Sequence, residues 1–280
     1  MHFTKMHGIG NDYIIVNCFE ETVSSPSEAA RRMSRRHYGV GSDGLILILP
    51  SHEAPLRMRI FNSDGSEAEM CGNGIRCVAA YAFNHDLCPG ETVEVETAAG
   101  VKTIQLDVEN GRAIGATVDM GEPGLLREEI PMDGPAGERV IDEPLEVNGG
   151  ELEVTCVSMG NPHCVIPVEE LDRDRCLEVG PKVEEHEAFP ERTNVHFVRA
   201  RGRGKVDVVT WERGAGATLA CGTGASAVCV AMSLLGQTER AITTHLPGGD
   251  LQLEWTDDDH VYMTGPAEEV FDGRWKTDGY

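Results

Sequence analysis

Met70-Cys71-Gly72-Asn73-Gly74 is followed by an apolar run from Ile75 to Phe83. This pattern is typical of a buried helix that begins directly after a cysteine. The stretch has a second copy 150 residues later, where Ala220-Cys221-Gly222-Thr223-Gly224 leads into the run from Ala225 to Leu235. The two copies predict two helices of the same design, each with a cysteine at its start.

The same offset of 150 residues holds over most of the chain. It places Gly10-Asn11 on Gly160-Asn161, Leu45 to Ile48 on Val195 to Val198, Phe61-Asn62 on Trp211-Glu212, and Gly115 on Gly265. One offset that recurs at so many places indicates a duplication. We therefore predict an α+β (mixed α/β) fold of two duplicated domains related by a pseudo-two-fold axis, each a mainly antiparallel sheet around a central helix.

A chain of 280 residues is longer than a usual single domain. The segment from Pro123 to Pro144 mixes proline, glycine and acidic residues, and we interpret it as the join between the halves. The predicted domains are residues 1–121 and 122–265. In the first domain, Ser27 is expected to cap a helix that runs to Arg36.

The composition excludes several classes of protein. Its 47 acidic and 24 basic residues give a net charge of -23, which repels nucleic acid and anionic membranes. No apolar run reaches the length of a membrane span, and the start of the chain from Met1 to Lys5 lacks the pattern of a signal peptide. We therefore expect a cytoplasmic protein without nucleic-acid or membrane partners.

The acidic surface also suggests a halophilic protein, because concentrated salt screens self-repulsion over a few ångströms. The alternative is an ordinary acidic protein of the cytosol. Melting curves in low and in molar KCl separate the two, and a melting temperature that salt does not change would contradict the halophilic hypothesis.

The nine cysteines show no paired spacing and no Cys-X-X-Cys motif, so we expect free thiols rather than disulfides or zinc ligands. A helix start favours the thiolate form of a cysteine. Taken singly, Cys71 or Cys221 is better explained as a small buried hydrophobic residue. Their matched context instead favours two groups that face each other across a cleft between the domains and act as acid and base. The other seven cysteines are assigned to packing.

Two further segments carry polar side chains at predicted strand ends. In Gly160-Asn161-Pro162-His163, His163 could shift the ionisation of a nearby thiol, although a lone histidine at a strand start is more often only hydrogen-bonded. In Trp211-Glu212-Arg213, Arg213 could pair with a substrate carboxylate, and Glu212 could hold an ammonium group or bias a thiol. A surface ion pair is an equally good explanation of these two charges.

Gly39-Val40-Gly41-Ser42-Asp43-Gly44 fits the spacing of a dinucleotide-binding loop, but it follows a predicted helix and precedes a strand, which is the reverse order. We reject a nucleotide site there. The sequence contains no Walker loop and no His-Glu-X-X-His motif, and we predict neither a metal nor a cofactor.

Five segments in their order along the chain resemble the diaminopimelate epimerase family. They are Gly10-Asn11-Asp12-Tyr13, Phe61-Asn62-Ser63-Asp64-Gly65 with Cys71-Gly72-Asn73-Gly74, Gly160-Asn161-Pro162-His163, Arg192-Thr193-Asn194-Val195, and Trp211-Glu212-Arg213-Gly214 with Ala220-Cys221-Gly222-Thr223-Gly224. The resemblance covers most of the chain. It implies a pyridoxal-independent isomerase that interconverts LL- and meso-2,6-diaminopimelate in lysine biosynthesis.

The resemblance also implies roles for individual residues. Cys71 and Cys221 would be the two bases, and His163 and Glu212 would tune the pKa of the thiols. Substrate-binding residues would be Asn11, Asn62, Gly72, Asn73, Asn161, Asn194, Glu212, Arg213, Gly222 and Thr223. The final strand, within residues 266–280, would return to the first domain.

Two positions depart from the family pattern: Gly44 stands where some members carry glutamine, and Ala217 replaces a frequent glutamate. Alternatives remain open at this point. Proline racemases and hydroxyproline epimerases also use paired cysteines, but typically carry histidine where this chain has Asn73. A catalytically silent amino-acid-binding protein would share the fold. The sequence does not define the oligomeric state, and a homodimer is kept as an alternative.

Overall fold

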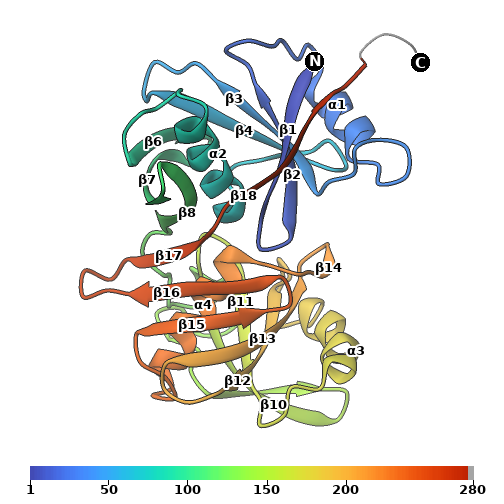
Figure 1. Ribbon diagram of the computed structural model, residues 1–280. Coiled ribbons are helices and arrows are strands. Elements are labelled where there is room, and N and C mark those ends of the chain that lie inside the picture. The colour runs from blue at the N-terminus through green and yellow to red at the C-terminus, as the bar shows by residue number, and fades with distance from the viewer. Residues whose placement is uncertain (277–280) are drawn as a thin grey trace. The chain divides into compact units, whose positions relative to one another are not determined.

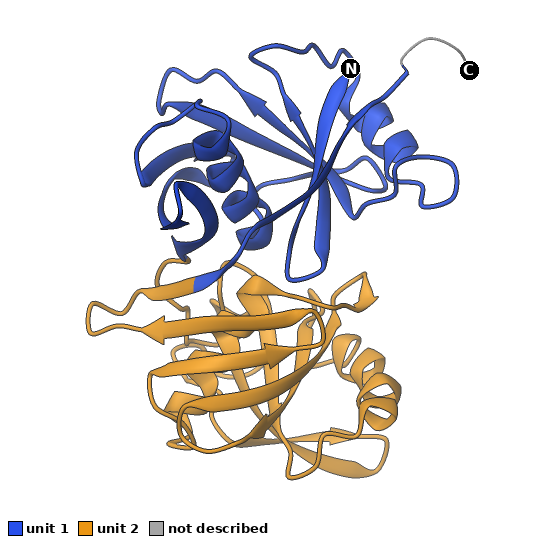
Figure 2. Cartoon of the chain, in the orientation of Figure 1, with its two compact units in different colours: residues 1–119, 264–280 blue, residues 120–263 orange. Residues whose placement is uncertain are grey.

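The computed structural model describes residues 1–276, which form two compact units (Figure 1, Figure 2). Unit 1 contains residues 1–119 and the described chain from Thr264 onward, and unit 2 contains Met120–Met263. Residues 277–280, which the predicted final strand included, lie outside the described residues.

Unit 1 is a mainly antiparallel sheet with two helices. Its elements in chain order are β1 (His2–Gly8), β2 (Asn11–Asn17), α1 (Pro26–Met33), β3 (Gly44–Leu49), β4 (Leu56–Asn62), β5 (Glu67–Ala68), α2 (Gly72–Asn84), β6 (Thr92–Thr97), β7 (Gly100–Glu109), β8 (Arg112–Asp119) and β18 (Glu268–Arg274). Strand β1 pairs in antiparallel fashion with β2 and β18, and β6, β7 and β8 form an antiparallel meander. The parallel pairs are β2 with β3 and β4 with β6. Strands of this sheet surround α2 (Figure 1).

Unit 2 repeats this order of elements. They are β9 (Glu143–Val147), β10 (Gly150–Ser158), β11 (Pro162–Pro167), α3 (Arg173–Glu184), β12 (Asn194–Ala200), β13 (Lys205–Glu212), β14 (Gly216–Ala217), α4 (Gly222–Leu234), β15 (Ala241–Leu246), β16 (Gly249–Trp255) and the first half of β17 (Val261–Pro266), whose remaining residues from Thr264 belong to unit 1. Two pairs of strands are again parallel. Strand β11 pairs with β12, as β2 does with β3, and β13 pairs with β15, as β4 does with β6. The mixed fold with one central helix per unit is confirmed.

The duplication is visible in local backbone geometry. Helices α2 and α4 begin at Gly72 and Gly222 and end at Asn84 and Leu234, so their bounds differ by 150 residues at both ends. The turns that precede β2 and β11 each contain a glycine with a left-handed backbone, with φ of 83° at Gly10 and 84° at Gly160. Glycine adopts this conformation without steric cost. The two turns therefore present the residues that follow them in the same way.

Two local predictions were wrong. Helix α1 has its N-cap at Ser25 rather than Ser27 and ends at Met33 rather than Arg36. Pro26 is well placed in the first turn because a helix leaves its first N–H groups without intrahelical partners. The helix stops because the N–H groups of Val40 and Gly41 both bond to the carbonyl of Met33 as the chain turns back.

The segment from Pro123 to Pro144, which we interpreted as the join between the halves, packs into unit 2. Ile130, Met132 and Val140 are buried in the hydrophobic cluster of that unit. Gly124 also forms backbone hydrogen bonds with Ser158 at the end of β10. The apolar residues spaced through this segment supply core contacts that its proline and glycine content obscures.

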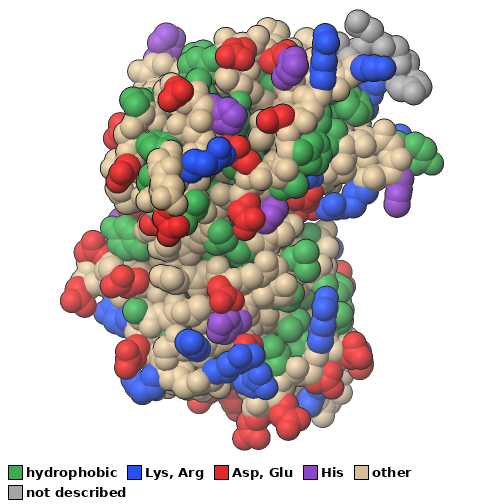
Figure 3. All heavy atoms as spheres, viewed as in Figure 1, with side chains coloured by type: hydrophobic (Ala, Val, Ile, Leu, Met, Phe, Trp, Pro, Cys, Tyr) green, Lys and Arg blue, Asp and Glu red, His purple; other side chains and the backbone are tan. Residues whose placement is uncertain are grey.

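Acidic side chains are spread over the surfaces of both units on the face that Figure 3 shows. No helix within residues 1–276 is long and apolar enough to cross a membrane.

Candidate active site

Cys71 and Cys221 occupy the N-cap positions of α2 and α4, as predicted. Both have extended backbones, with φ of −143° and −131°. The first intrahelical bonds run from Ile75 N to Cys71 O and from Ala225 N to Cys221 O, each 2.9 Å long. The N–H groups of the three residues after each cysteine therefore precede the helical ladder, where they can bind an anion.

The glycine three residues after each cysteine allows a close helix–strand contact. A Cβ at Gly74 would lie 2.9 Å from Cδ1 of Ile46 on β3. A Cβ at Gly224 would overlap the ring of His196 on β12 and lie 3.1 Å from Cys221 Sγ. The small residues of the Cys-Gly-X-Gly motif thus hold each cysteine against the sheet of its own unit.

Unit 1 surrounds Cys71 with polar groups from two elements, β2 and α2. The hydroxyl of Tyr13 lies 3.0 Å from Cys71 Sγ and 2.8 Å from Asn11 Oδ1. Asn73 Nδ2 donates to the same oxygen of Asn11 over 3.2 Å. The guanidinium of Arg76, which is fully buried, donates to Asn73 Oδ1 over 2.9 Å. The predicted site residues Asn11 and Asn73 therefore lie together beside Cys71.

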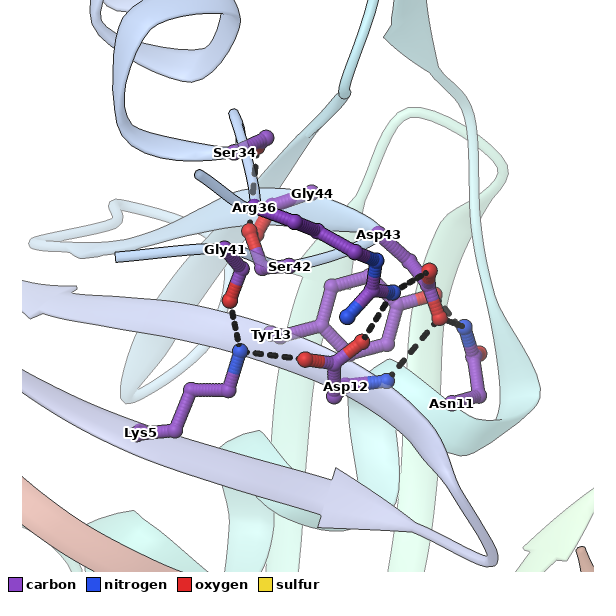
Figure 4. A network of polar contacts seen from close by, with 10 residues as sticks. All are labelled: Lys5, Asn11, Asp12, Tyr13, Ser34, Arg36, Gly41, Ser42, Asp43 and Gly44. Carbon is purple, nitrogen blue, oxygen red and sulfur yellow. Dashed lines mark hydrogen bonds and ion pairs between the residues drawn. The ribbon is translucent and has the colours of Figure 1, made fainter. Parts of the chain in front are cut away.

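A charged network holds Asn11 from the other side (Figure 4). Asn11 Nδ2 donates to Asp43 Oδ2 over 2.8 Å, and Arg36 bridges Asp43 and Asp12. Lys5 forms an ion pair with Asp12 and a hydrogen bond with the carbonyl of Gly41. Burial raises the pKa of Asp12, but the charges of Lys5 and Arg36 outweigh it and leave that pKa below its usual value.

Asn62 and Gly44 pair in the sheet at the end of β4. The Asn62 side chain is exposed and donates from Nδ2 to Ser66 Oγ over 3.0 Å. A Cβ at Gly44 would overlap the carbonyl oxygen of Phe61. Glycine at position 44 therefore matches the close approach of β3 and β4 in this chain.

Unit 2 places a chain of hydrogen bonds near its cysteine. His163 Nε2 lies 2.8 Å from Asn161 Oδ1, and His163 Nδ1 lies 2.9 Å from His196 Nε2. His196 Nδ1 in turn lies 3.0 Å from Thr210 Oγ1. An amide oxygen only accepts and a neutral imidazole carries one N–H, so the proton donors point in sequence from Thr210 toward Asn161. Cys221 Sγ itself lies 3.6 Å from Thr223 Oγ1.

His163 and His196, the two histidines in this series of hydrogen bonds, are neutral at physiological pH. Burial lowers the pKa of His196 to about 3. Burial, followed by the neighbouring His196 and Arg213, lowers the pKa of His163 well below its usual value. The two imidazoles therefore carry no charge in this part of unit 2.

Asn194 connects two site segments of unit 2 with both ends of its amide. Its Nδ2 donates to the carbonyl of Pro162, and its Oδ1 accepts from the backbone N–H of Arg213 over 3.0 Å. Arg213 also donates to the carbonyl of Glu191, and the half-buried Glu212 ends strand β13. Ala217 lies exposed on β14, opposite Trp211.

The other seven cysteines include six that are buried and one, Cys18, that is half-buried. Burial raises the pKa of Cys77 and of Cys229 to about 12, so these thiols stay protonated. Burial of these six residues agrees with the packing role predicted for them. Within residues 1–276, no group of three His, Cys, Asp or Glu side chains is arranged to hold a metal ion.

The sequence analysis did not place Tyr13, Arg76 or His196 at the site. Two signals could have found them. Tyr13 stands 150 residues before His163, and Arg76 and His196 each put a polar side chain at a buried position of an apolar element.

The fold of the two units is shared with solved structures of low sequence identity. A crystal structure of a probable proline racemase from Agrobacterium radiobacter superposes with a TM-score of 0.72 at 15% identity, covering 99% of this chain and 93% of that one. Identity this low is evidence for the fold alone.

Sequence comparison resolves the family. Residues 3–126 and 155–270 match the diaminopimelate epimerase family. The chain is 55% identical to the diaminopimelate epimerase of Moorella thermoacetica over 99% of its own length and 100% of the relative's. It is also 55% identical to that of Acetivibrio thermocellus over 98% of each chain. The chain belongs to the diaminopimelate epimerase family, and the resemblance seen in its motifs is confirmed.

Proposed function

We propose that the chain interconverts LL- and meso-2,6-diaminopimelate by two-base proton transfer, with Cys71 and Cys221 as the acid–base pair. The observation that carries this proposal is the matched placement of the two cysteines at helix starts, in a chain 55% identical to diaminopimelate epimerases over nearly its whole length. A place in lysine biosynthesis follows from that reaction.

Inversion of a stereocentre by proton transfer requires a base on one face of the carbon and an acid on the other. In one direction, the Cys71 thiolate removes the α-proton and the electron pair stays on the α-carbon and its carboxylate. The Cys221 thiol then delivers its proton to the opposite face and becomes the thiolate. The reverse reaction exchanges the two roles, so each sulfur must be stable both with and without its proton.

The helix starts supply the electrostatic stabilisation in this proposal. The N–H groups that follow Cys71 and Cys221, at Gly72 and Asn73 and at Gly222 and Thr223, would bind the carboxylate at the reacting carbon. Negative charge that develops there is stabilised by fixed N–H dipoles, which need no reorganisation during the reaction.

The far end of the substrate carries a second amino-acid group. Arg213 is the proposed partner of its carboxylate, and Glu212 of its ammonium group. Asn62 and Asn161 would contribute amide contacts. Because both ends of the Asn194 amide bond to backbone, we assign Asn194 to holding the Arg213 segment in place. The cytoplasmic location and a homodimer remain predictions.

The test is an assay of the purified chain with LL-diaminopimelate, L-proline and trans-4-hydroxy-L-proline, each followed by chiral chromatography. We expect inversion of diaminopimelate and none of the two ring substrates. Inversion of proline or hydroxyproline alone would assign the chain to the racemase alternative. Failure to invert any of the three would support a binding protein.

A further inference from the structure

The hydroxyl of Tyr13 lies beside Cys71 and has no role in the function proposed above. Tyr13 comes from β2 and is only 5% exposed. Its hydroxyl lies 3.0 Å from Cys71 Sγ and 2.8 Å from Asn11 Oδ1. A hydroxyl has one proton to donate and can also accept, so it can serve these two partners in more than one way.

The orientation of Asn11 is fixed by a charge. Its Nδ2 donates to the carboxylate of Asp43, which only accepts, so its Oδ1 must face Tyr13 (Figure 4). Arg36 holds Asp43 in turn by an ion pair of 2.9 Å.

Asn73 is fixed in the same manner from the opposite side. Arg76 can only donate, and it bonds to Asn73 Oδ1, so Asn73 Nδ2 faces Asn11 Oδ1. The oxygen that Tyr13 contacts in Asn11 is therefore an acceptor in every state of the site.

The Tyr13 O–H can consequently donate either to Asn11 Oδ1 or to Cys71 Sγ, and the protonation state of Cys71 determines which of the two it bonds to. Cys71 Sγ lies 3.7 Å from Asn11 Oδ1 and only 3.0 Å from the Tyr13 hydroxyl. When Cys71 is a thiol, its S–H therefore donates to the nearer Tyr13 oxygen, and the Tyr13 O–H donates to Asn11 Oδ1. When Cys71 is a thiolate, the Tyr13 O–H turns to the sulfur, because a hydrogen bond to an ionised acceptor is the stronger one. Asn11 Oδ1 keeps its bond from Asn73 in both states.

The phenol keeps its own proton throughout. Burial, followed by the charge of Cys71, raises the pKa of Tyr13 well above its usual value. Tyr13 therefore does not compete with Cys71 as a base, and it remains a donor at any pH at which the protein works.

We propose that Tyr13 is a further catalytic residue of unit 1, whose hydroxyl accepts a hydrogen bond from the Cys71 thiol and donates one to the Cys71 thiolate, so that both forms are stabilised in turn. This inference rests on the proposed role of Cys71 in the epimerase reaction. Tyr13 stands 150 residues before His163, so the two units place different polar rings at matched positions.

The first test removes only the oxygen. Tyr13→Phe should lower kcat about ten- to a hundredfold with KM changed less than threefold, because a buried hydrogen bond to a charged group is lost. Tyr81→Phe is the matched control, since Tyr81 is a buried tyrosine of α2 about 15 Å along the helix from Cys71. A kcat for Tyr13→Phe within twofold of the control would overturn the proposal.

Alkylation by iodoacetamide separates this proposal from the function itself, because it needs no substrate. In Tyr13→Phe, modification of Cys71 at neutral pH should slow about tenfold while that of Cys221 is unchanged, both followed by peptide mass spectrometry. Equal Cys71 rates in Tyr13→Phe and Tyr81→Phe would overturn the proposal even if wild-type protein epimerises diaminopimelate. Slower Cys71 alkylation in a protein that inverts no substrate would support the Tyr13 contact and contradict the proposed function.

A measurement in a chain with Tyr13 intact covers the case in which Tyr13→Phe does not fold. Tyrosine labelled with carbon-13 at Cζ is introduced into the Cys221→Ala protein, and Cys71 is capped as a methyl disulfide. One tyrosine resonance should shift on capping, because the sulfur can then no longer donate a proton to the phenol. If no tyrosine resonance moves, the contact between Tyr13 and Cys71 does not exist in solution and the proposal fails.

Discussion

The starts of α2 and α4 have the same backbone and different surroundings. Both carry an N-cap cysteine, two glycines and a run of buried small residues. The side chains at matched positions around them differ. The pairs are Tyr13 and His163, Ile46 and His196, Ile60 and Thr210, and Arg76 and Ser226.

The duplicated fold therefore does not give the two cysteines equal surroundings. In unit 1, aliphatic side chains lie against the helix start, and charged groups, Asp43 and Arg76, fix the amides beside the cysteine. In unit 2, two neutral imidazoles and a hydroxyl form the chain near the cysteine. The backbone at the two cysteines is matched, whereas the polar groups around each sulfur differ.

The largest effect is expected from removing one sulfur at a time. Cys71→Ala and Cys221→Ala should each lower epimerisation about 10²- to 10⁴-fold, because one proton-transfer group is lost. In D₂O, each variant should still exchange the α-proton of one isomer, and the two variants should act on opposite isomers. The measurement is NMR of both isomers with each variant. Full activity in either variant would refute the paired role.

A smaller effect is expected at His196, which we assign as a positioning residue that acts through His163. His196→Ile installs the residue found at matched position 46 and removes the donor to His163 Nδ1. It should lower kcat/KM about tenfold or more, equally in both directions because the equilibrium constant is fixed. The readouts are initial rates in each direction and the nitrogen-15 shifts of the His163 ring, which should report a changed tautomer.

The control for that variant is His196→Gln, whose amide can donate to His163 from nearly the same place. Recovery of most of the activity and of the His163 ring shifts is expected. If the glutamine and isoleucine variants are equally impaired, His196 contributes only packing. The hydrogen bond to His163 would then no longer distinguish unit 2 from unit 1.

The two units should also differ in how the free energy of unfolding depends on pH. Folded His163 and His196 stay neutral, whereas unfolded histidines bind protons below about pH 6.5. The stability that these residues contribute is therefore complete above that pH and is lost as the pH falls toward the folded value, about 3 for His196. The slope reaches about 1.4 kcal/mol per pH unit for each histidine.

The unit 1 network loses stability at lower pH. Asp12 has a lowered pKa, so its contribution is present above about pH 4 and is lost as the pH falls below that. Urea unfolding at about pH 7 and about pH 5, in wild type and His196→Ile, isolates the histidine part. An equal loss of stability in both proteins would contradict the assignment of buried neutral histidines.

The smallest effect is expected at Ser226. Its hydroxyl donates to the carbonyl of Gly222 over 3.1 Å, where the matched Arg76 donates to Gly72 in unit 1. Ser226→Ala should cost at most about 1 kcal/mol of unfolding free energy and leave kcat within twofold. Urea unfolding and initial rates measure both quantities. A large loss of activity would mean that unit 2 also depends on a polar group within its helix.

Much of the fold could be predicted from the sequence, because the helix starts and the duplication follow from local sequence patterns. The helix starts at Cys71 and Cys221 follow from glycine and apolar runs, and the duplication follows from one constant offset. The end of α1 could not be predicted, because backbone bonds from Val40 and Gly41 stop it. The packing of Ile130 and Val140 into unit 2 was hidden by the prolines and glycines around them.

The candidate site was predicted where its residues belong to motifs. Tyr13 and His196 were missed for a different reason. Each lies inside a strand whose apolar residues predict a position in the core. The contacts of Tyr13 with Cys71 and of His196 with His163 form only in the folded protein. The ring type alone does not separate a packed ring from one that bonds to a reactive group, so the available signals were the offset of 150 residues between Tyr13 and His163 and the polar ring of His196 in an apolar strand.

The central claim is that two different sulfurs exchange one proton each with the substrate from opposite faces. It is tested most directly by starting with LL-diaminopimelate in D₂O and following the α-positions of substrate and product by NMR at low conversion. With two bases, the meso product should carry solvent deuterium at its inverted carbon while unreacted LL substrate stays protonated. Deuterium entering the recovered substrate as fast as the product would contradict it and indicate a single base.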